Sequence, residues 1–475
     1  MTLAQLHSEL DAYMDSGAFA AELDHRVAYR TESDLGAPPP ALAAYLEQAL
    51  VPALAGWGFA CQVHANPDPR GGPFLVAERT EHPDLPTVLT YGHGDVVNGQ
   101  EGRWGPGRSP WVVQREGDRW YGRGTADNKG QHTINLAALG RVLAAREGRL
   151  GYNVKVLIEM GEEAGSPGLA AFCEAQQHAL KADLFLACDG PRVAADRPTL
   201  FMGSRGAVNF TLAYNARERG QHSGNWGGVL ANPATVLTHA WASLVDAHGR
   251  IQVAALRPPP LTPALREALA GVPVGGAPED PLPTPGWGEP GLTPVERLVA
   301  WNTLEVLAMG AGNPDRPVNA IPASATLTGQ LRFVVGTPWE SLHDLLRAHL
   351  DAAGFEAVTV RIDASAPATR LPLDHPWVRW AKASMAASTQ GPVAVLPNLA
   401  GTLPNHIFAH TLGLPTLWVP HSHPACNQHA PDEHLLASVA REGLHAMGGL
   451  YWDLGEPTAP WFDTDTQPAE TASPQ

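Results

Sequence analysis

His93 and Asp95 are the first residues whose types and spacing could do chemistry. They follow the apolar run 87–91, which is typical of a buried strand. Residues two apart on an extended chain point to the same side, so the two side chains are expected to act together. A metal-bound histidine commonly donates its other ring N–H to a carboxylate, so His93 could be a ligand supported by Asp95. The alternative is an ordinary surface or capping pair.

Asp127 lies in a glycine-rich stretch, residues 122–130. It comes two residues before the start of a helix predicted over 129–146. The usual role of an aspartate at this position is to cap the helix, because its side chain accepts a hydrogen bond from a free backbone N–H. The second interpretation is that the turn delivers Asp127 as a metal ligand. The turn by itself favours the cap.

Glu162 and Glu163 follow the apolar strand predicted over 154–158. Because neighbouring side chains point in different directions, the pair suits a division of labour. Glu163 is the candidate cation ligand, and Glu162 is the candidate general base facing a metal-activated water. Adjacent glutamates are also common on solvated helices, but the buried strand before this pair and the Gly-Ser soon after it disfavour that interpretation.

Asp189 follows another apolar run, 184–187, and His429 lies in the loop 421–433, which is rich in candidate ligands. Polar groups at the carboxyl ends of four predicted parallel strands would converge on one sheet edge, where open α/β folds place ligands. Two imidazoles and three carboxylates suit Zn²⁺, Mn²⁺ or Co²⁺ better than Ca²⁺ or Mg²⁺.

The cysteines lack the paired spacing of a thiolate zinc site or a disulfide framework. We interpret all four as buried small residues. Two of them adjoin candidate site residues and could line the site: Cys188 and Cys426.

The elements that must position these residues alternate between helical patterns and short apolar strands over residues 1–205. This order predicts an α/β fold with a mostly parallel sheet and helices on both faces. Residues 206–369 carry two strand-helix units with additional strands, which predicts an inserted α+β domain of the split βαβ kind. Residues 370–455 then complete the first domain.

Two segments are predicted to lie outside these packed elements. Residues 255–292 are rich in proline and glycine, which favours a long surface excursion within the inserted domain. Residues 456–475 are polar and proline-rich without periodicity, and we expect a disordered tail.

Five motifs, taken in order, resemble the dinuclear metallopeptidases that include aminoacylase, carnosinase, glutamate carboxypeptidase, acetylornithine deacetylase and succinyl-diaminopimelate desuccinylase. They are Gly-His-Gly-Asp, Gly-Arg-Gly-Thr-Ala-Asp-Asn-Lys-Gly, Gly-Glu-Glu-Ala-Gly-Ser, Asp-Gly-Pro and His-Ala-Pro-Asp-Glu. The resemblance covers nearly the entire chain. It implies a zinc-peptidase type catalytic domain, two divalent ions, and hydrolysis of an amide bond in a peptide or N-acyl amino acid.

The same resemblance implies a role for each residue. One ion would be held by His93 and Asp189, the other by Glu163 and His429, with Asp127 bridging them. Asp95 would support His93, and Glu162 would be the base. Zn²⁺ is the expected metal, with Mn²⁺ or Co²⁺ as alternatives.

The inserted domain is implied to be a ferredoxin-like lid that also forms a homodimer. Its motif Gly-Gln-His-Ser-Gly contains His222, which would reach the partner subunit's site to stabilise an oxyanion. Asn319 and Arg332 match positions that hold a substrate carboxylate, for which an arginine fork is well shaped. Gly401 belongs to a substrate loop that usually reads Gly-Ser, whereas this chain has Gly401-Thr402. Arg332 could instead be a surface strand arginine.

Several functions remain open at this point. The lid and residues 221–228 look more like carnosinase, which favours a dipeptidase over an amino-acid deacylase. A non-catalytic ligand-binding relative would lack the base or a ligand, and a structural zinc site usually has four closed ligands.

The overall charge excludes some classes of partner. A net charge of -16 repels nucleic acid and anionic membranes. The first residues lack a signal-peptide pattern, and nowhere do 18 apolar residues run together, so we expect a cytoplasmic protein without a membrane span.

Overall fold

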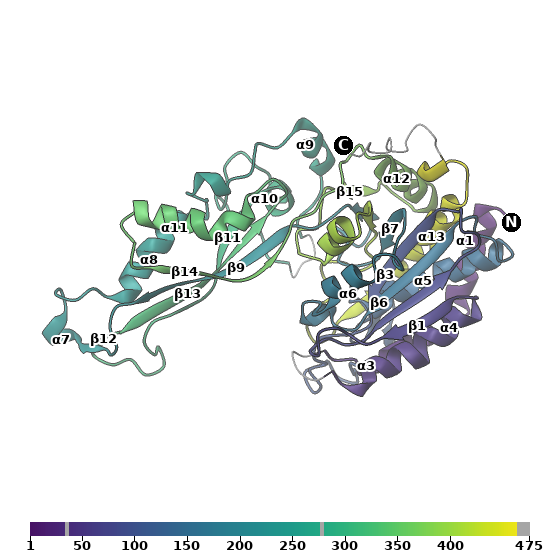
Figure 1. Cartoon of the computed structure of the whole chain (residues 1–475). Helices are drawn as coiled ribbons and strands as arrows, with labels where there is room; N and C mark the ends of the chain where they lie inside the picture. Colours follow the sequence, from purple (N-terminus) through teal and green to yellow (C-terminus); the bar gives the residue numbers. More distant parts are fainter. Residues whose placement is uncertain (34–37, 276–279, 463–475) are drawn as a thin grey trace.

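The computed structural model describes residues 1–33, 38–275 and 280–462. It has two parts: a larger body built on an eight-stranded sheet, and an elongated inserted unit built on a four-stranded sheet (Figure 1). The first helix, Leu3–Asp15, and the last described element, the 3₁₀-helix Pro460–Phe462, both belong to the larger body. Among the described helices, none is long and apolar enough to cross a membrane.

The sheet of the larger body is mixed, with parallel strands at its centre. Its strands, in spatial order, are β1 (Ala60–His64), β2 (Phe74–Arg79), β6 (Asn153–Glu159), β3 (Thr87–His93), β7 (Leu184–Ala187), β16 (Thr416–Trp418), β8 (Thr199–Phe201) and β15 (Ala394–Leu396). β6, β3, β7 and β16 run parallel, as do β8 and β15, whereas β1 with β2, β2 with β6, and β16 with β8 are antiparallel. The parallel centre is the part that the sequence predicts.

Helices cover both faces of this sheet, as predicted. One face carries α5 (Lys129–Ala145) and α13 (Ala437–Leu454), with α12 (Pro376–Ser388), α1 (Leu3–Asp15) and α2 (Ala18–Val27) packed around them. Short segments precede β1: α3 (Pro40–Ala44), a π-helix (Tyr45–Leu50) and α4 (Val51–Gly56). The opposite face carries α6 (Leu169–Ala175) and the π-helix Ile407–Thr411. Because α5 is buried on almost every side, it lies inside the body rather than on its surface.

The inserted unit has the split βαβ arrangement. Its elements are β9 (Gly206–Asn215), α8 (Pro233–Leu244), β11 (Thr303–Gly310), β13 (Ser324–Phe333), α11 (Leu342–Ala352) and β14 (Thr359–Ala366). The antiparallel order β11-β13-β9-β14 is that of a ferredoxin-like fold. Alternate residues of β9 are buried against the two helices, which leaves the other sheet face uncovered by them.

Two small sheets complete the described chain. The first joins β4 (Gln114–Glu116), β5 (Arg119–Tyr121) and β17 (His434–Leu436). The second pairs β10 (Gln221–His222) with β12 (Ala320–Ile321), next to the one-turn helix α7 (Ser223–Trp226).

The prediction that residues 255–292 form a long surface excursion is right in that most of the described residues there are exposed, but it is wrong in assigning the whole segment to the inserted domain. This region contains α9 (Pro263–Leu269) and leads into α10 (Pro294–Ala300). Leu269, Val295 and Val299 pack in the same cluster as Phe201 and Trp418 of the larger body. Each helix begins with a threonine cap followed by proline, a favoured start, so prolines that suggested a loop in fact open helices. Residues 276–279 lie outside the described residues.

The predicted disordered tail also needs a correction. A short 3₁₀-helix, Pro460–Phe462, is described, and the Trp461 ring lies 5.6 Å from that of Tyr152 and 5.1 Å from that of Trp377. Aromatic burial thus orders the segment up to residue 462. The remainder of the predicted tail, 463–475, lies outside the described residues.

Candidate metal centre

Three groups of candidate site residues lie at or just after the ends of strands. His93 is the last residue of β3, Glu162 and Glu163 lie in the 3₁₀-helix that follows β6, and Asp189 lies just after β7. The parallel register pairs His93 with Glu159, so these strands end at the same sheet edge. The expected convergence at this edge therefore occurs for three of the four strands.

Asp127 reaches the site by a different route from the one predicted. It lies in the turn between β5 and α5, and β5 belongs to the small three-stranded sheet rather than the main one. Its side chain binds His93 and His429, and no cap hydrogen bond is made by the residue at the start of α5, Asn128. The helix-cap interpretation of Asp127 is therefore wrong.

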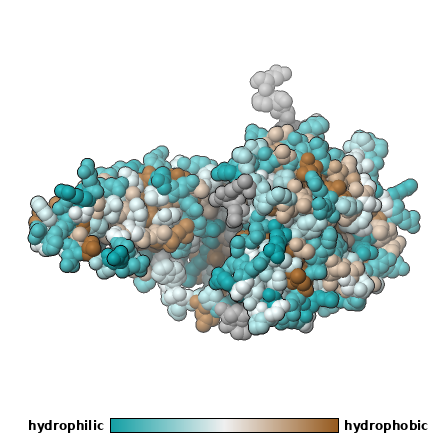
Figure 2. All heavy atoms as spheres, turned by 90° about the horizontal axis from the view of Figure 1, so that it is seen from below, coloured by the Kyte–Doolittle hydropathy of each residue, from teal (hydrophilic) through white to brown (hydrophobic). Residues whose placement is uncertain are grey.

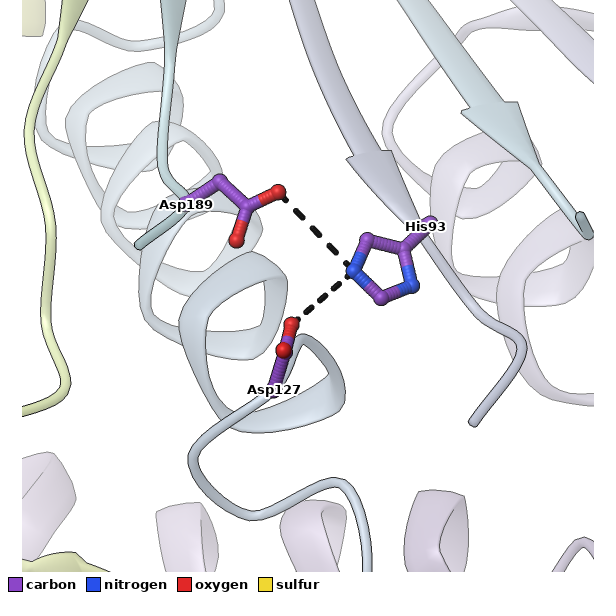
Figure 3. A group of neighbouring side chains, drawn as sticks. All are labelled: His93, Asp127 and Asp189. Carbon is purple, nitrogen blue, oxygen red and sulfur yellow. Dashed lines mark hydrogen bonds and ion pairs between the residues drawn. The ribbon is translucent and has the colours of Figure 1, made fainter. Parts of the chain in front are cut away.

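The five predicted ligands form two groups that share Asp127. In the first, Nε2 of His93 lies 3.0 Å from Oδ1 of Asp127 and 3.8 Å from Oδ2 of Asp189 (Figure 3). In the second, Nε2 of His429 lies 3.0 Å from Oδ2 of Asp127 and 2.9 Å from Oε2 of Glu163. One carboxylate thus faces both groups, as a bridging ligand would.

The charges of these groups fit cations. Burial, followed by the charge of Asp127, raises the pKa of Glu163 to about 7 and that of Asp189 to about 6. Burial also raises the pKa of Glu162 well above its ordinary value. Oδ2 of Asp189 is buried without a hydrogen-bond partner in the described chain. Crowded carboxylates with an unpaired buried oxygen are stabilised by a bound cation, and the mixed nitrogen and oxygen donors suit zinc-like ions.

The pKa values of the two histidines are also raised, and for a histidine this favours the charged form. Burial opposes the charged form of His93, but hydrogen bonds with Asp127 and Asp95 raise its pKa well above the ordinary value. Hydrogen bonds with Asp127 and then Glu163 raise the pKa of His429 to about 10. Protonated imidazoles thus balance the carboxylates, a role that a divalent ion would take over when the ring nitrogens bind it.

Asp95 supports more than His93. Nδ1 of the His93 ring lies 3.1 Å from the backbone oxygen of Asp95 and 3.4 Å from its Oδ1, which leaves Nε2 facing the other ligands. The same carboxylate accepts the backbone N–H groups of Glu162 and Glu163, each at 3.1 Å, and the hydroxyl of Ser33 at 2.7 Å. The contacts with the two glutamates were not predicted from the sequence.

Gln428 is a site residue that the sequence analysis missed. Its side-chain amide donates a hydrogen bond to Oδ2 of Asp127, the atom that His429 also contacts. Its position directly before His429 is the only signal that could have drawn attention to it. Cys188, one of the two cysteines that could line the site, is buried next to Asp189. Its sulfur lies 3.4 Å from Nε2 of His421, which is not one of the candidate ligands.

Arg332 and the Gly401 loop meet where the inserted unit joins the larger body. Nη1 of Arg332, on β13, donates to the Thr402 hydroxyl at 2.6 Å, and that hydroxyl donates to the backbone oxygen of Arg205 at 2.9 Å. Arg332 is therefore not a free surface arginine. The threonine in the place of the usual serine supplies the hydroxyl that holds it.

His222 and Asn319 lie side by side at the far end of the inserted unit. β10 pairs with β12, and the backbone N–H of Ser223 donates to the oxygen of Asn319 at 2.9 Å. α7 and β12 lie at the end remote from β3 and β6 (Figure 1). Nδ1 of His222 accepts the N–H of Gly224 at 3.2 Å, so a neutral ring carries its proton on Nε2. Within the described chain these two residues are apart from the metal ligands.

Comparison with curated proteins finds dipeptidases. The cysteinylglycine-S-conjugate dipeptidase of Corynebacterium striatum is 36% identical over 172 residues, covering 36% of this chain and 37% of that protein. The human Beta-Ala-His dipeptidase is 34% identical over 183 residues, covering 38% of this chain and 36% of that protein. The matches span little more than a third of either relative.

Solved structures share the fold over nearly the whole chain. The M20 family metallo-carboxypeptidase Sso-CP2 of Sulfolobus solfataricus has a TM-score of 0.76 at 23% identity, covering 91% of this chain and 98% of that one. Human carnosine dipeptidase 1 has a TM-score of 0.76 at 20% identity, covering 96% and 99%. The model of the peptidase family M20/M25/M40 matches residues 89–452. The chain therefore belongs to the peptidase family M20/M25/M40.

Proposed function

We propose that this protein is a metal-dependent dipeptidase that hydrolyses the amide bond of a dipeptide. The observation that carries the proposal is the pair of three-residue ligand groups sharing Asp127, with Glu162 beside them. The names of the curated relatives favour a dipeptide over an N-acyl amino acid. An amino-acid deacylase is the less favoured alternative.

The proposed cofactors are two divalent ions, most simply Zn²⁺, with Mn²⁺ or Co²⁺ as alternatives. His93 and Asp189 would hold one, Glu163 and His429 the other, and Asp127 both. Bound there, such ions polarise a substrate carbonyl and lower the pKa of water. The mixed imidazole and carboxylate donors support this assignment.

Glu162 is proposed as the general base. Its Oε2 lies 3.9 Å from Nε2 of His93, so the carboxylate borders the ligand groups without belonging to either. Burial raises the pKa of Glu162 well above its ordinary value, and a higher pKa makes the ionised carboxylate a stronger base toward water. Oε2 of Glu162 would accept the proton of the attacking water and pass it to the leaving amine.

Arg332 and Gly401 are proposed to bind the substrate carboxylate. A guanidinium can donate two parallel hydrogen bonds to a carboxylate, which orients as well as binds it. Arg332 lies at the junction of the two parts, and its hydrogen bonds in the described chain go to the neutral side chains of Gln330 and Thr402. A substrate with a free carboxyl terminus would therefore match this site.

His222 and Asn319 are proposed to act in the site of a second copy. Their remote position means that one chain alone leaves the substrate pocket incomplete. The edge strand β11 exposes Val306, Leu307 and Met309, and an unpaired apolar edge favours association with another chain. A homodimer through the inserted unit would present Nε2–H of His222 to the developing oxyanion.

The expected cytoplasmic location stays a prediction.

The test is hydrolysis of a panel of dipeptides and N-acyl amino acids by metal-stripped protein refilled with Zn²⁺, Mn²⁺ or Co²⁺. Metal-dependent turnover of dipeptides should fall by about 10²–10⁴-fold in Glu162→Gln, the range expected for loss of a general base. Refilled protein that binds no metal, or turnover equal in the variant, would reject the proposal. Turnover confined to N-acyl amino acids would select the deacylase instead.

A further inference from the structure

The carboxylate of Glu433 is buried beside the metal-ligand groups without belonging to them. It is 1% exposed, and its Oε1 accepts three backbone N–H groups, from Gly124 at 3.0 Å, Ala126 at 2.9 Å and Asp127 at 3.1 Å. All three donors belong to the turn that carries Asp127. A carboxylate that accepts several N–H groups holds such a turn in one conformation.

The other oxygen of Glu433 is held as firmly. Oε2 lies 2.6 Å from Nη1 of Arg123, a fully buried side chain whose Nη2 donates to the backbone oxygen of Asn98 at 3.0 Å. The backbone oxygen of Glu433 accepts the N–H of Gly122 at 3.0 Å. The end of the His429 loop is therefore joined to the Asp127 turn by side chain and backbone together.

This link matters because of where the ligands come from. His93, Glu163 and Asp189 follow strands of the main sheet, which fixes their positions relative to one another. Asp127 and His429 come from two irregular segments that no strand of that sheet positions. Glu433 lies four residues after His429 and binds the turn of Asp127, so its carboxylate, together with the adjacent pairing of β17 with β5, holds the two segments at a fixed distance.

We propose that Glu433 is a positioning residue that builds the second ligand group, Asp127, Glu163 and His429, by tying the Asp127 turn to the His429 loop. The inference rests on the proposed metal centre. Glu433 would not touch an ion itself, because its oxygens are directed to backbone N–H groups and to Arg123. Its loss should weaken the binding of one ion more than that of the other.

The experiment titrates metal-free protein with Zn²⁺ by calorimetry and with Co²⁺ by its visible absorption, for four forms. These are wild type, Glu433→Met, which removes both acceptor oxygens, the double variant Arg123→Met with Glu433→Met, and Glu442→Gln. Glu442 pairs with the buried Arg192 at 2.5 Å and serves as the matched control for the loss of a buried ion pair. The double variant removes the unpaired guanidinium, which restores stability and keeps the test valid if the single variant does not fold.

The expected result is a drop of about 10–100-fold in affinity for one of two ions in Glu433→Met, the size typical of lost support around a ligand. The weaker-bound Co²⁺ should also show an altered spectrum. The double variant should regain its melting temperature but not its affinity, and Glu442→Gln should lose stability alone.

Two results would overturn the inference while leaving the metal centre intact. One is wild-type affinity for both ions in the double variant, which would mean that Glu433 only balances the charge of Arg123. The other is an equal loss of affinity in Glu442→Gln, which would tie metal binding to general stability. Failure of the wild type to bind two ions would instead reject the proposed function.

Discussion

Asp95 accepts the backbone N–H of Glu162 at 3.1 Å, so the residue that supports the ligand His93 also holds the candidate base. Its second oxygen does the same for Glu163. One buried carboxylate therefore connects the end of β3 with the turn after β6. The face of the molecule seen in Figure 2 is mainly hydrophilic with scattered hydrophobic residues.

Replacing Asp95 by asparagine should weaken metal binding by about 10–100-fold. The asparagine side chain has an NH₂ donor in place of one acceptor oxygen. The backbone N–H of Glu162 or Glu163 that faces it is then left unpaired. Calorimetric titration with Zn²⁺ measures the effect. Ser33→Ala removes only one hydrogen bond to the same carboxylate and should change the affinity little. Wild-type affinity in Asp95→Asn would contradict this role.

Replacing Glu163 by glutamine should reduce the number of tightly bound ions from two to one. Glu163 belongs to the group with His429, whereas the group of His93, Asp127 and Asp189 stays complete. Metal content after dialysis gives the stoichiometry. Glu162→Gln is the matched control, because it changes the adjacent glutamate and should keep both ions. Two ions retained in Glu163→Gln would remove it from the ligand set.

Mixing two inactive variants should restore activity if His222 acts in the partner's site. In a two-fold dimer, His222→Ala and Glu162→Gln subunits combine so that one of the two sites regains both residues. Co-expression in equal amounts should give about a quarter of wild-type turnover, because half of the dimers are hybrids. Turnover no higher than that of the separate variants would show that each chain uses its own His222.

Arg332→Lys should raise KM for dipeptides with a free carboxyl terminus. Lysine keeps the charge but loses the planar fork that grips two oxygens. Because the contact is made away from the scissile bond, KM should change more than kcat. A dipeptide amide, which lacks the carboxylate, should be hydrolysed equally by both proteins. An equal rise in KM for the amide would place the carboxylate elsewhere.

Acid should destabilise the protein partly through His406. Burial, followed by the charge of His410, lowers the pKa of His406 to about 4. The unfolded chain takes up this proton near pH 6.5, so between these values the unfolded state binds more protons than the folded state. The contribution is complete above pH 6.5 and is lost as the pH falls toward 4.

The measurement for His406 is the urea midpoint across that pH window. His406→Gln should lose less stability on acidification than the wild type does. His343→Gln, which replaces a half-exposed histidine of α11, should follow the wild type. Parallel curves for His406→Gln and wild type would show that His406 does not contribute.

The parts of the site predicted best from the sequence follow buried strands. A short apolar run that is followed within two residues by a polar group fixes both the element and the edge where the group lies, as at His93 and Asp189. Asp127 lies in a turn whose partners are far away in sequence, so its local pattern indicated a helix cap. The Glu433 contacts escaped prediction for the same reason, because they join residues about 300 apart.

Elements of the inserted unit were predicted more reliably than the segment that leaves it. The alternation in β9 and the amphipathic patterns of α8 and α11 each report a single buried face. Leu269 lies in a segment rich in prolines and glycines, and its burial depends on a neighbour outside the unit. A local pattern carries no information about which distant surface will cover it.

The packing of α9 and α10 on the larger body changes the mechanical coupling between the two parts. The chain passes from one part to the other four times: before β9, between residues 256 and 261, before β11, and after β14. A unit joined by two adjacent connections can swing and twist freely. With four, a rotation displaces the ends of every connection that lies off its axis, so the inserted unit is more restricted in its motion than one joined by two.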